Sequence, residues 1–443
     1  MRTTLALIAV ATVASVAVVG RCQSTPTPAQ TLAMAPTPVT LTLAQAEKIA
    51  LQQNPHVQIA RLIALAEGQV RREARAANLP ALTGYLTAVD SHDGSRITAG
   101  GLNNPVVYQR AAGGVTLSQL MTDFGRTHAL INSADFSARA AASNESASRE
   151  DVLLAVDDAF YRALASQAIL SVALQTVAAR QATADQIRAL TEAKLRSELD
   201  LSFANVDLQQ AKLLLLNATN DNQESQAALN AILGEELPAV YMLVDETHAA
   251  PAPAPEDAAP LLQLALQSRP DLASLNLQAS AAKEFSHAEH DLVRPTISAL
   301  GVAGDAPVRA DQIATPWYGA AGVNVSIPIF DGFLFSARAN EAKFRAQAAD
   351  QSVQQLRQTI ARDVTDTVLE AQSGFQRIDV SRQLLEQANS AFDLAQTRYK
   401  LGLSSIVELS QAQLAQTQAQ IAYASARYAY QQTLAALRFQ TGQ

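Results

Sequence analysis

Few side chains in this 443-residue sequence are spaced to do chemistry together. His287 and His290, with Glu289 between them, lie three residues apart, which puts both imidazoles on one face of a helix. This spacing differs from the His-Glu-x-x-His arrangement of zinc proteases, and no third ligand is evident, so a solvated helix face is the better interpretation. With six scattered histidines and no glycine-rich phosphate loop, the sequence predicts no enzyme, no metal site and no cofactor.

The single cysteine, Cys22, excludes an intrachain disulfide and a thiolate metal cluster. It follows residues 1–21, where Arg2 precedes a charge-free apolar run typical of a secretory signal peptide. The position resembles a lipoprotein processing site, but Arg21 stands where a small residue should precede a lipidated cysteine. Three outcomes therefore stay open: lipidation of Cys22, ordinary cleavage before the Pro-rich segment 22–40, and retention of the apolar run as a membrane anchor.

The composition is typical of long helices rather than of an ordinary globular enzyme. Hydrophobic residues make up 48% of the chain, with much alanine, whereas aromatic residues make up only 5% and glycines number 18. The formal net charge is −8, and both signs are mixed along the chain. A nucleic-acid-binding protein should show a basic face, so this class is excluded. After the N-terminal run, no segment has enough consecutive apolar residues for another transmembrane helix.

The sequence contains two copies of one unit. A shift of 208 residues aligns the rear of the unit, and a shift of 215 residues aligns its front. The aligned pairs include Asp123 with Asp331, Asp200 with Glu408, Gly234 with Gly442, Pro55 with Pro270, and Pro80 with Pro295. Because the shifts differ by seven residues, copy one has an insertion between Pro80 and Leu117, which we expect in a surface loop. The expected repeats are 41–248 and 261–443, joined by the Ala-Pro linker 249–260.

Both copies present the same order: a short helix, a helix of about 23 residues, two strands, a very long helix and a helix of about 35 residues. In copy one we expect helices at 42–53, 56–78, 125–194 and 200–233, and strands at about 80–90 and 106–121. In copy two we expect strands at about 295–303 and 317–329, and helices at 333–400 and 406–440. A helix of 70 residues spans roughly 105 Å, which is too long for a compact domain.

The expected strands alternate apolar residues with small polar ones. In the second strand of copy two, Val323, Val325 and Ile327 alternate with Asn324 and Ser326. This pattern fits a sheet with lipid on one face and water on the other, and it also fits a half-buried soluble sheet. Four strands cannot close a barrel, and open strand edges are not viable in lipid. If these strands span a membrane, several chains must therefore share one barrel.

Aromatic residues near the strand ends suit an interfacial girdle of a membrane barrel. They are Trp317, Tyr318 and Tyr108.

In this duplicated order, the chain resembles the TolC-type outer-membrane efflux protein family over nearly its whole mature length. The residues that carry the resemblance are Leu41 to Ala46 with Asn54-Pro55, Leu117-Ser118-Gln119, Asp123 to Arg126, Ile327 to Gly332, Arg398 to Gly402, Glu408-Leu409 and Gly442. The resemblance implies a mainly α fold with a small β part. Three chains would form a 12-stranded outer-membrane β-barrel, which a periplasmic α-helical barrel continues.

The resemblance also implies a function and partners. The protein would be the passive exit duct of a tripartite efflux or type I secretion system, without catalysis. Its partners would be two identical chains in a homotrimer, a periplasmic adaptor protein, an inner-membrane RND or ABC transporter, and outer-membrane lipid. The alternative is a periplasmic coiled-coil adaptor or scaffold, but an adaptor should have one helical hairpin rather than two equivalent copies.

In this family the periplasmic end of the duct is closed near the helix–helix turns. By this resemblance Tyr399 is the gate tyrosine, whereas the arginine expected five residues later is Ser404. Asp200 and Glu408 match acidic positions after each turn and would form a cation-selective ring, or they are simply acids in the first turn of a helix. The alternative interpretation of Tyr399 is a residue that serves packing alone. We expect Gly402 to supply a positive φ in the turn, where copy one has Lys194.

Overall fold

The computed structural model describes residues 39–92, 109–235, 239–245, 253–308 and 315–442. The signal peptide, Cys22, Tyr108, almost all of the Pro-rich segment and the first part of the linker lie outside these residues. So does most of the loop in which we expect the insertion of copy one.

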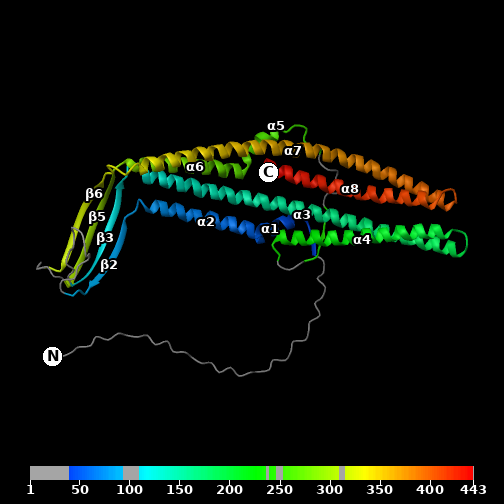
Figure 1. The fold of residues 1–443 in the computed structure, drawn as a ribbon, viewed down its shortest axis with the longest axis horizontal. Coiled ribbons are helices and arrows are strands. Elements are labelled where there is room, and N and C mark those ends of the chain that lie inside the picture. Colours follow the sequence, from blue (N-terminus) through cyan, green and yellow to red (C-terminus); the bar gives the residue numbers. More distant parts are fainter. Residues whose placement is uncertain (1–38, 93–108, 236–238, 246–252, 309–314, 443) are drawn as a thin grey trace, which may run out of the picture. The chain divides into compact units, whose positions relative to one another are not determined.

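Twelve elements form two equivalent sets (Figure 1). Copy one consists of α1 (Leu43–Gln53), α2 (Pro55–Ala76), β2 (Ala81–Val89), β3 (Arg110–Thr122), α3 (Arg126–Glu192) and α4 (Glu198–Leu233). Copy two consists of α5 (Ala259–Ser268), α6 (Pro270–His290), β5 (Thr296–Val308), β6 (Trp317–Ser326), α7 (Leu334–Lys400) and α8 (Ile406–Thr441), with a 3-10 turn at Asp291–Val293. α3 and α7 both have 67 residues, and α4 and α8 both have 36.

The ends of these elements follow local chemistry. Asn54 and Arg269 are extended, with ψ of 124° and 122°, because each precedes a proline, and this separates α1 from α2 and α5 from α6. α4 begins before the expected residue 200 because Ser197 caps its first turn. β6 ends at Ser326 rather than at 329, and Pro328, which has no N–H to donate to a ladder, follows it closely.

The strands form one antiparallel sheet in the order β2-β3-β5-β6. In its register Leu117 lies between Leu82 and Gly301, and Gly301 in turn pairs with Ala321. All four belong to the apolar face, so the alternation of the sequence becomes one continuous face across the strands. β2 and β6 are the outer strands, and each is paired along one side only within the described chain.

The two aromatic residues at the start of β6 lie on opposite faces of the sheet. Trp317 pairs with Asp305 on the apolar face and is 67% exposed. Tyr318 lies on the other face, where its hydroxyl occupies the space that a Cβ of Gly114 or Gly304 would need. Of these two residues, only Trp317 is therefore placed for the expected aromatic girdle, because consecutive residues of a strand alternate in direction.

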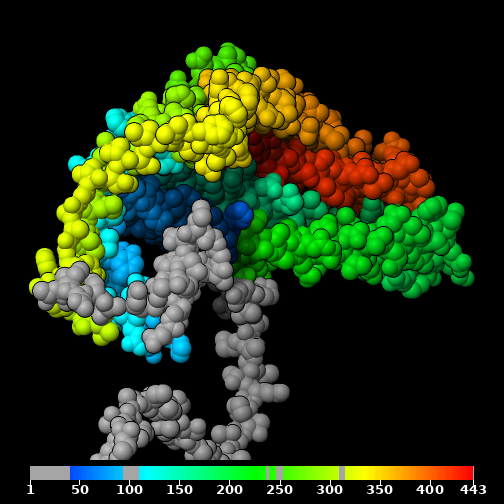
Figure 2. Space-filling view, turned by 60° about the vertical axis from the view of Figure 1, so that its left-hand side comes forward, coloured from blue at the N-terminus to red at the C-terminus, as the bar shows by residue number. Residues whose placement is uncertain are grey.

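The helices form two packed sets that also contact one another. α2 and α4 lie end to end along α3, and α6 and α8 lie end to end along α7 (Figure 1). The copies meet where α3 packs against α6 and α8. In Figure 2 the red and orange surface of α7 and α8 lies beside the green surface of α3 and α4. Among the described residues, no helix is both long and apolar enough to cross a bilayer.

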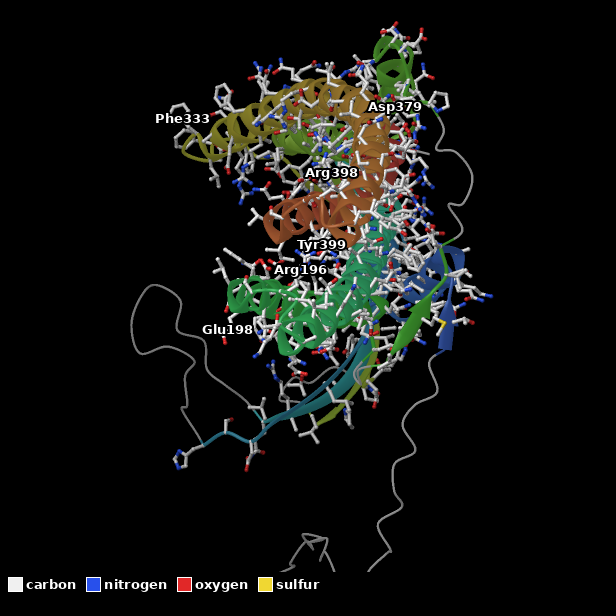
Figure 3. The ribbon with its side chains drawn as sticks, turned by 90° about the vertical axis from the view of Figure 1, so that its right-hand side faces the viewer. Arg196, Glu198, Phe333, Asp379, Arg398 and Tyr399 are labelled. Carbon is white, nitrogen blue, oxygen red and sulfur yellow. The ribbon has the colours of Figure 1, made fainter. Side chains whose placement is uncertain are left out.

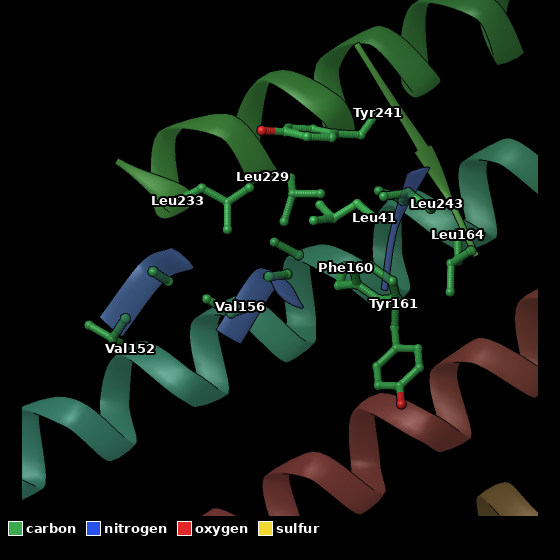
Figure 4. Close-up of a cluster of buried hydrophobic side chains, with 14 of the residues drawn as sticks. Leu41, Val152, Val156, Phe160, Tyr161, Leu164, Leu229, Leu233, Tyr241 and Leu243 are labelled. Atoms are coloured by element: carbon green, nitrogen blue, oxygen red, sulfur yellow. The ribbon is translucent and has the colours of Figure 1, made fainter. Parts of the chain in front are cut away.

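The largest buried cluster lies halfway along α3, around Phe160 and Val156 (Figure 4). Two short strands that the sequence pattern did not reveal, β1 (Val39–Leu41) and β4 (Tyr241–Leu243), pair in parallel beside it. Leu41 and Leu243 from these strands pack into the cluster with Leu229 and Leu233 of α4. This region fixes the chain before α1 and the chain after α4 to the middle of α3.

Candidate functional site at the helix turns

The two helix–helix turns share one backbone conformation. Lys194 has φ of +59° and Gly402 has φ of +74°, and these positions correspond in the repeat. In each turn an amide bonds back five residues: Leu195 to the carbonyl of Leu190, and Leu403 to that of Arg398, both at 2.8 Å. Gly402 therefore supplies the expected positive φ, and Lys194 adopts the same conformation in spite of its side chain.

Both acids of the candidate ring have local partners within the chain. Asp200 and Ser197 form a capping box, in which the Ser197 hydroxyl accepts from the Asp200 amide at 3.1 Å and Asp200 accepts from the Ser197 amide at 3.4 Å. Glu408 instead forms an ion pair with Arg398, with 3.3 Å between Oε1 and Nε. The geometry of Asp200 is thus that of an acid in the first turn of a helix, and Glu408 is held against the end of α7.

Tyr399 is 5% exposed and packs in an apolar cluster at the turns. The other buried members are Ala184, Ile187, Ala204, Leu208, Ile406 and Leu409. The guanidinium of Arg196 lies 4.5 Å from the ring centroid of Tyr399, and its Nη2 donates to the Tyr399 carbonyl at 3.3 Å. Figure 3 shows both side chains together between the end of α3–α4 and the end of α7–α8. This cation–π contact therefore joins the turn of copy one to the turn of copy two.

The charges around Tyr399 act in opposite directions. Burial raises the pKa of its hydroxyl, Arg196 lowers this pKa, and Asp200 raises it. The phenol therefore stays protonated at neutral pH. The Tyr399 hydroxyl and the Ser404 Oγ are both buried, and no described residue offers either of them a hydrogen-bond partner.

Sequence reasoning looked for an arginine at 404 and missed the one at 196. The repeat contains the missing signal, because a shift of 208 residues places Arg196 on Ser404. The arginine is thus present in the other turn, where it contacts Tyr399 from the first copy. On the copy-two side of this contact lie Tyr399, Gly402 and Ser404. On the copy-one side lie Arg196 and Asp200.

The turns also expose large apolar side chains to solvent. Leu195, Leu199, Leu401 and Leu403 are all more than 60% exposed. Isolated exposed leucines are common on proteins, but four at the two turns form a candidate contact surface.

Comparison with known proteins gives matches along most of the chain. A profile of the family described as "Outer membrane efflux protein" matches residues 48–235 and 261–443. The solvent efflux pump outer membrane protein SrpC of Pseudomonas putida is 25% identical over 256 residues, which is 56% of this chain and 53% of SrpC. Protein CyaE of Bordetella pertussis is 25% identical over 302 residues, covering 68% of this chain and 64% of CyaE. The chain thus spans about half the length of SrpC.

Solved structures share the fold. The outer-membrane channel OprN matches with a TM-score of 0.79 at 20% identity, covering 90% of this chain and 89% of that one. The outer membrane protein VceC of Vibrio cholerae matches with a TM-score of 0.76 at 19% identity, covering 90% and 96%. These similarities confirm the expected fold class, a mainly helical chain with duplicated units and few strands.

Proposed function

This chain belongs to the outer membrane efflux protein family, and from that premise we propose that it is the passive outer-membrane exit duct of a tripartite efflux or type I secretion system. It conducts from the periplasm to the exterior, and the helix turns gate its periplasmic end. Neither catalysis nor an energy source is part of this function. The adaptor or scaffold alternative loses its basis, because the family profile matches both copies.

The observation that carries the proposal is the four-stranded sheet, whose two outer edges have no partner strand among the described residues and which has one exposed apolar face. On this face Leu86 is 93% exposed, Val323 64% and Val325 52%. Exposing such an apolar surface to water is unfavourable, whereas the acyl chains of a bilayer can cover it. In lipid the free edges of β2 and β6 must also be paired. Joining β6 of one chain to β2 of the next chain would pair these edges in a sheet that lipid surrounds, and three chains would supply 12 strands.

The gate belongs to the same proposal. Arg196 and Tyr399 hold the two turns of one chain together, and Gly402 and Ser404 form the turn on the Tyr399 side. Asp200 and Glu408 lie directly behind the turns, so a homotrimer repeats them three times near its axis and biases the opening toward cations.

The partners follow from the position of the turns. A periplasmic adaptor protein would pack near 190–205 and 395–412, where Leu195, Leu199 and Leu403 are exposed. An inner-membrane RND or ABC transporter would supply the energy. Several curated relatives carry the words "efflux pump outer membrane protein" in their names, which is consistent with an efflux role for this chain.

Conductance in a planar lipid bilayer tests the proposal. The full chain, purified from outer membranes in detergent, should form trimers and conduct ions with a preference for cations. Changing Asp200 and Glu408 together to Ala should lower cation selectivity and relieve block by multivalent cations. Asp379→Ala is the matched control, because Asp379 is an exposed acid of α7 that lies 20 residues before Tyr399. Recovery of a soluble periplasmic monomer without detergent would contradict the duct, and unchanged selectivity would reject the acidic ring.

A further inference from the structure

A buried polar cluster lies on α3 above the turns, twelve residues before the helix ends. Its centre is Arg180, whose side chain is 8% exposed and forms an ion pair with Asp207 at 3.0 Å. The Ser410 hydroxyl donates to Asp207 at 2.6 Å, and Arg180 Nη2 donates to the Ser410 carbonyl at 3.5 Å. Arg180 Nη1 also donates to Gln413 Oε1. These four residues are the Arg180 cluster.

The Arg180 cluster joins the two copies. Arg180 and Asp207 lie on α3 and α4 of copy one, whereas Ser410 and Gln413 lie on α8 of copy two. If α8 moved away, Arg180 and Asp207 would stay paired. They would lose their hydrogen bonds with Ser410 and Gln413. Burial lowers the pKa of Arg180 and Asp207 raises it again, so the guanidinium keeps its charge and its need for acceptors. Separation of the copies at this level is therefore costly.

The surroundings of the cluster differ above and below it. Below lies the apolar cluster of Tyr399, Ile187 and Leu409. A cavity of about 220 Å³ adjoins the cluster, and its walls combine the apolar side chains of Ala179 and Phe392 with amides and hydroxyls from Gln175, Thr176, Gln413, Gln416, Thr417 and Gln420. Such walls hold water, which can solvate Gln413 and Arg180 once they part. Contact and separation are thus both physically accessible states for this cluster.

We propose that the Arg180 cluster is a second closing contact of the duct, about 18 Å above the end of α3 at 1.5 Å per residue. The inference rests on the proposed function, in which the turns open. Breaking the Arg196–Tyr399 contact frees the turns alone, while α8 stays held at Ser410 and Gln413. Only release of the Arg180 cluster lets α7 and α8 part from α3 and α4 over a longer stretch. The cluster therefore sets how far the duct opens.

Copy two has no equivalent of this charge pair. The positions that correspond to Arg180 and Asp207 are Ala388 and Ala415. The contact is thus made once per chain, from copy one to copy two. A trimer would contain three of them at one level of the duct.

The test removes the two side-chain hydrogen bonds of α8, those of the Ser410 hydroxyl and the Gln413 amide, and leaves the charge pair and the Ser410 carbonyl in place. The double variant Ser410→Ala, Gln413→Leu keeps Arg180 beside Asp207, so it strands no unpaired buried charge. The control is Gln432→Leu, which removes another bond from α8 to α3, because Gln432 donates to the side chain of Asp158 at 2.8 Å far above the turns. Arg196→Ala serves as the turn variant. Circular dichroism and size-exclusion chromatography verify that each variant is folded and assembled.

Planar-bilayer recordings of the full chain then compare the closed and open conductance. Losing a hydrogen bond to a charged group shifts an equilibrium roughly tenfold. The double variant loses two such bonds, so we expect it to raise the fraction of time in the largest conductance level about a hundredfold. Gln432→Leu should leave this fraction unchanged, and Arg196→Ala should add only small openings. Combining Arg196→Ala with the double variant should give the most frequent large openings.

The outcomes separate this inference from the proposed function. If Arg196→Ala changes conductance and the double variant does not, the second closing contact is wrong while the duct stands. An equal rise in Gln432→Leu would also overturn it, because any loss of contact between the copies would then suffice. If folded, assembled chains conduct in no variant at all, the proposed function itself fails.

Discussion

The two copies have the same backbone and different polar residues. Their long helices are equal in length, their turns share a positive φ, and α4 and α8 end at Gly234 and Gly442 with φ of +83° and +70°. At corresponding positions, however, copy one has Arg196 where copy two has Ser404. The same holds for Arg180 against Ala388 and Asp157 against Thr365. The duplicated fold thus constrains the backbone and the apolar positions far more than the polar ones.

These unmatched residues lie where the copies meet. Arg196 contacts Tyr399, and Arg180 contacts Ser410 and Gln413. Each of these two arginines of copy one thus contacts residues of copy two. A polar residue that is present in only one copy is therefore a better guide to the contact between copies than any motif shared by both.

The largest expected difference between the copies lies in the apolar core. Phe160 is 2% exposed in the main cluster, and its counterpart Val368 is also 2% exposed. Phe160→Ala should lower the free energy of unfolding by about 4 kcal/mol, because it leaves a large cavity. Val368→Ala removes only two methyl groups and should cost about 2 kcal/mol. Thermal unfolding in detergent, followed by circular dichroism, measures both, and equal losses would show that the two cores are interchangeable.

The next effect is a pH dependence that belongs to copy one. Asp157 is 7% exposed, and burial, the nearby Glu47 carboxylate and a hydrogen bond with it raise its pKa to about 7, against the opposing effect of Arg438. Copy two has Thr365 and Leu262 at the corresponding positions. The folded chain therefore keeps a proton on Asp157 that the unfolded chain releases. The free energy of unfolding should fall as the pH rises from about 4 to about 7.

Asp157→Asn removes this dependence. The variant should be more stable than the natural chain at pH 8 by up to about 4 kcal/mol and nearly equal to it at pH 4. Thermal unfolding between these pH values measures the effect, and Asp185→Asn, an exposed acid of the same helix, is the control. If the natural chain gained stability from pH 4 to pH 8 relative to Asp157→Asn, the assigned direction of the pKa shift would be wrong.

Much of the fold could be read from the sequence, because long periodic patterns and prolines determine it. Asn54-Pro55 and Arg269-Pro270 mark helix ends by steric restriction alone, and the apolar steps of α7 place Val353, Ile360 and Val364 in the core. The short strands β1 and β4 could not be read, since three residues carry too little periodicity. Their pairing depends on Leu41 and Leu243, which are distant in sequence.

The candidate site could be read only in part. The positive φ at Gly402 follows from its residue type, but nothing about a lysine suggests the same conformation at Lys194. The contact between Arg196 and Tyr399 spans 203 residues, and neither turn alone indicates it. The Arg180 cluster was missed for the same reason: its four residues come from three helices, and packing alone brings them together.

The contact between the turns should respond to smaller changes. Arg196→Ala removes a cation–π contact worth about 1 kcal/mol, so the turns should open about fivefold more often. Arg196→Lys keeps the charge without the planar guanidinium, so its turns should open more often than those of the natural chain and less often than those of Arg196→Ala. Placing the arginine in the other turn, as Arg196→Ser with Ser404→Arg, tests whether copy one is the required donor. Full recovery of closure by this exchange would show that the difference between the copies does not matter here.

The smallest expected effect concerns the backbone of the turns, where the copies differ in residue but not in conformation. Lys194→Gly relieves the steric cost of a side chain at φ of +59°, although the glycine loses more entropy on folding. The net gain should be about 0.5 kcal/mol in the free energy of unfolding. Gly402→Ala introduces the steric cost at φ of +74°, and the smaller entropy loss of alanine on folding offsets only part of it, so this change should lower the free energy of unfolding by about 0.5 kcal/mol. Opposite signs in the two turns, measured by thermal unfolding, would show that the shared conformation is imposed by packing in copy one and favoured by residue type in copy two. The same sign in both would mean that the turns do not share this conformation in solution.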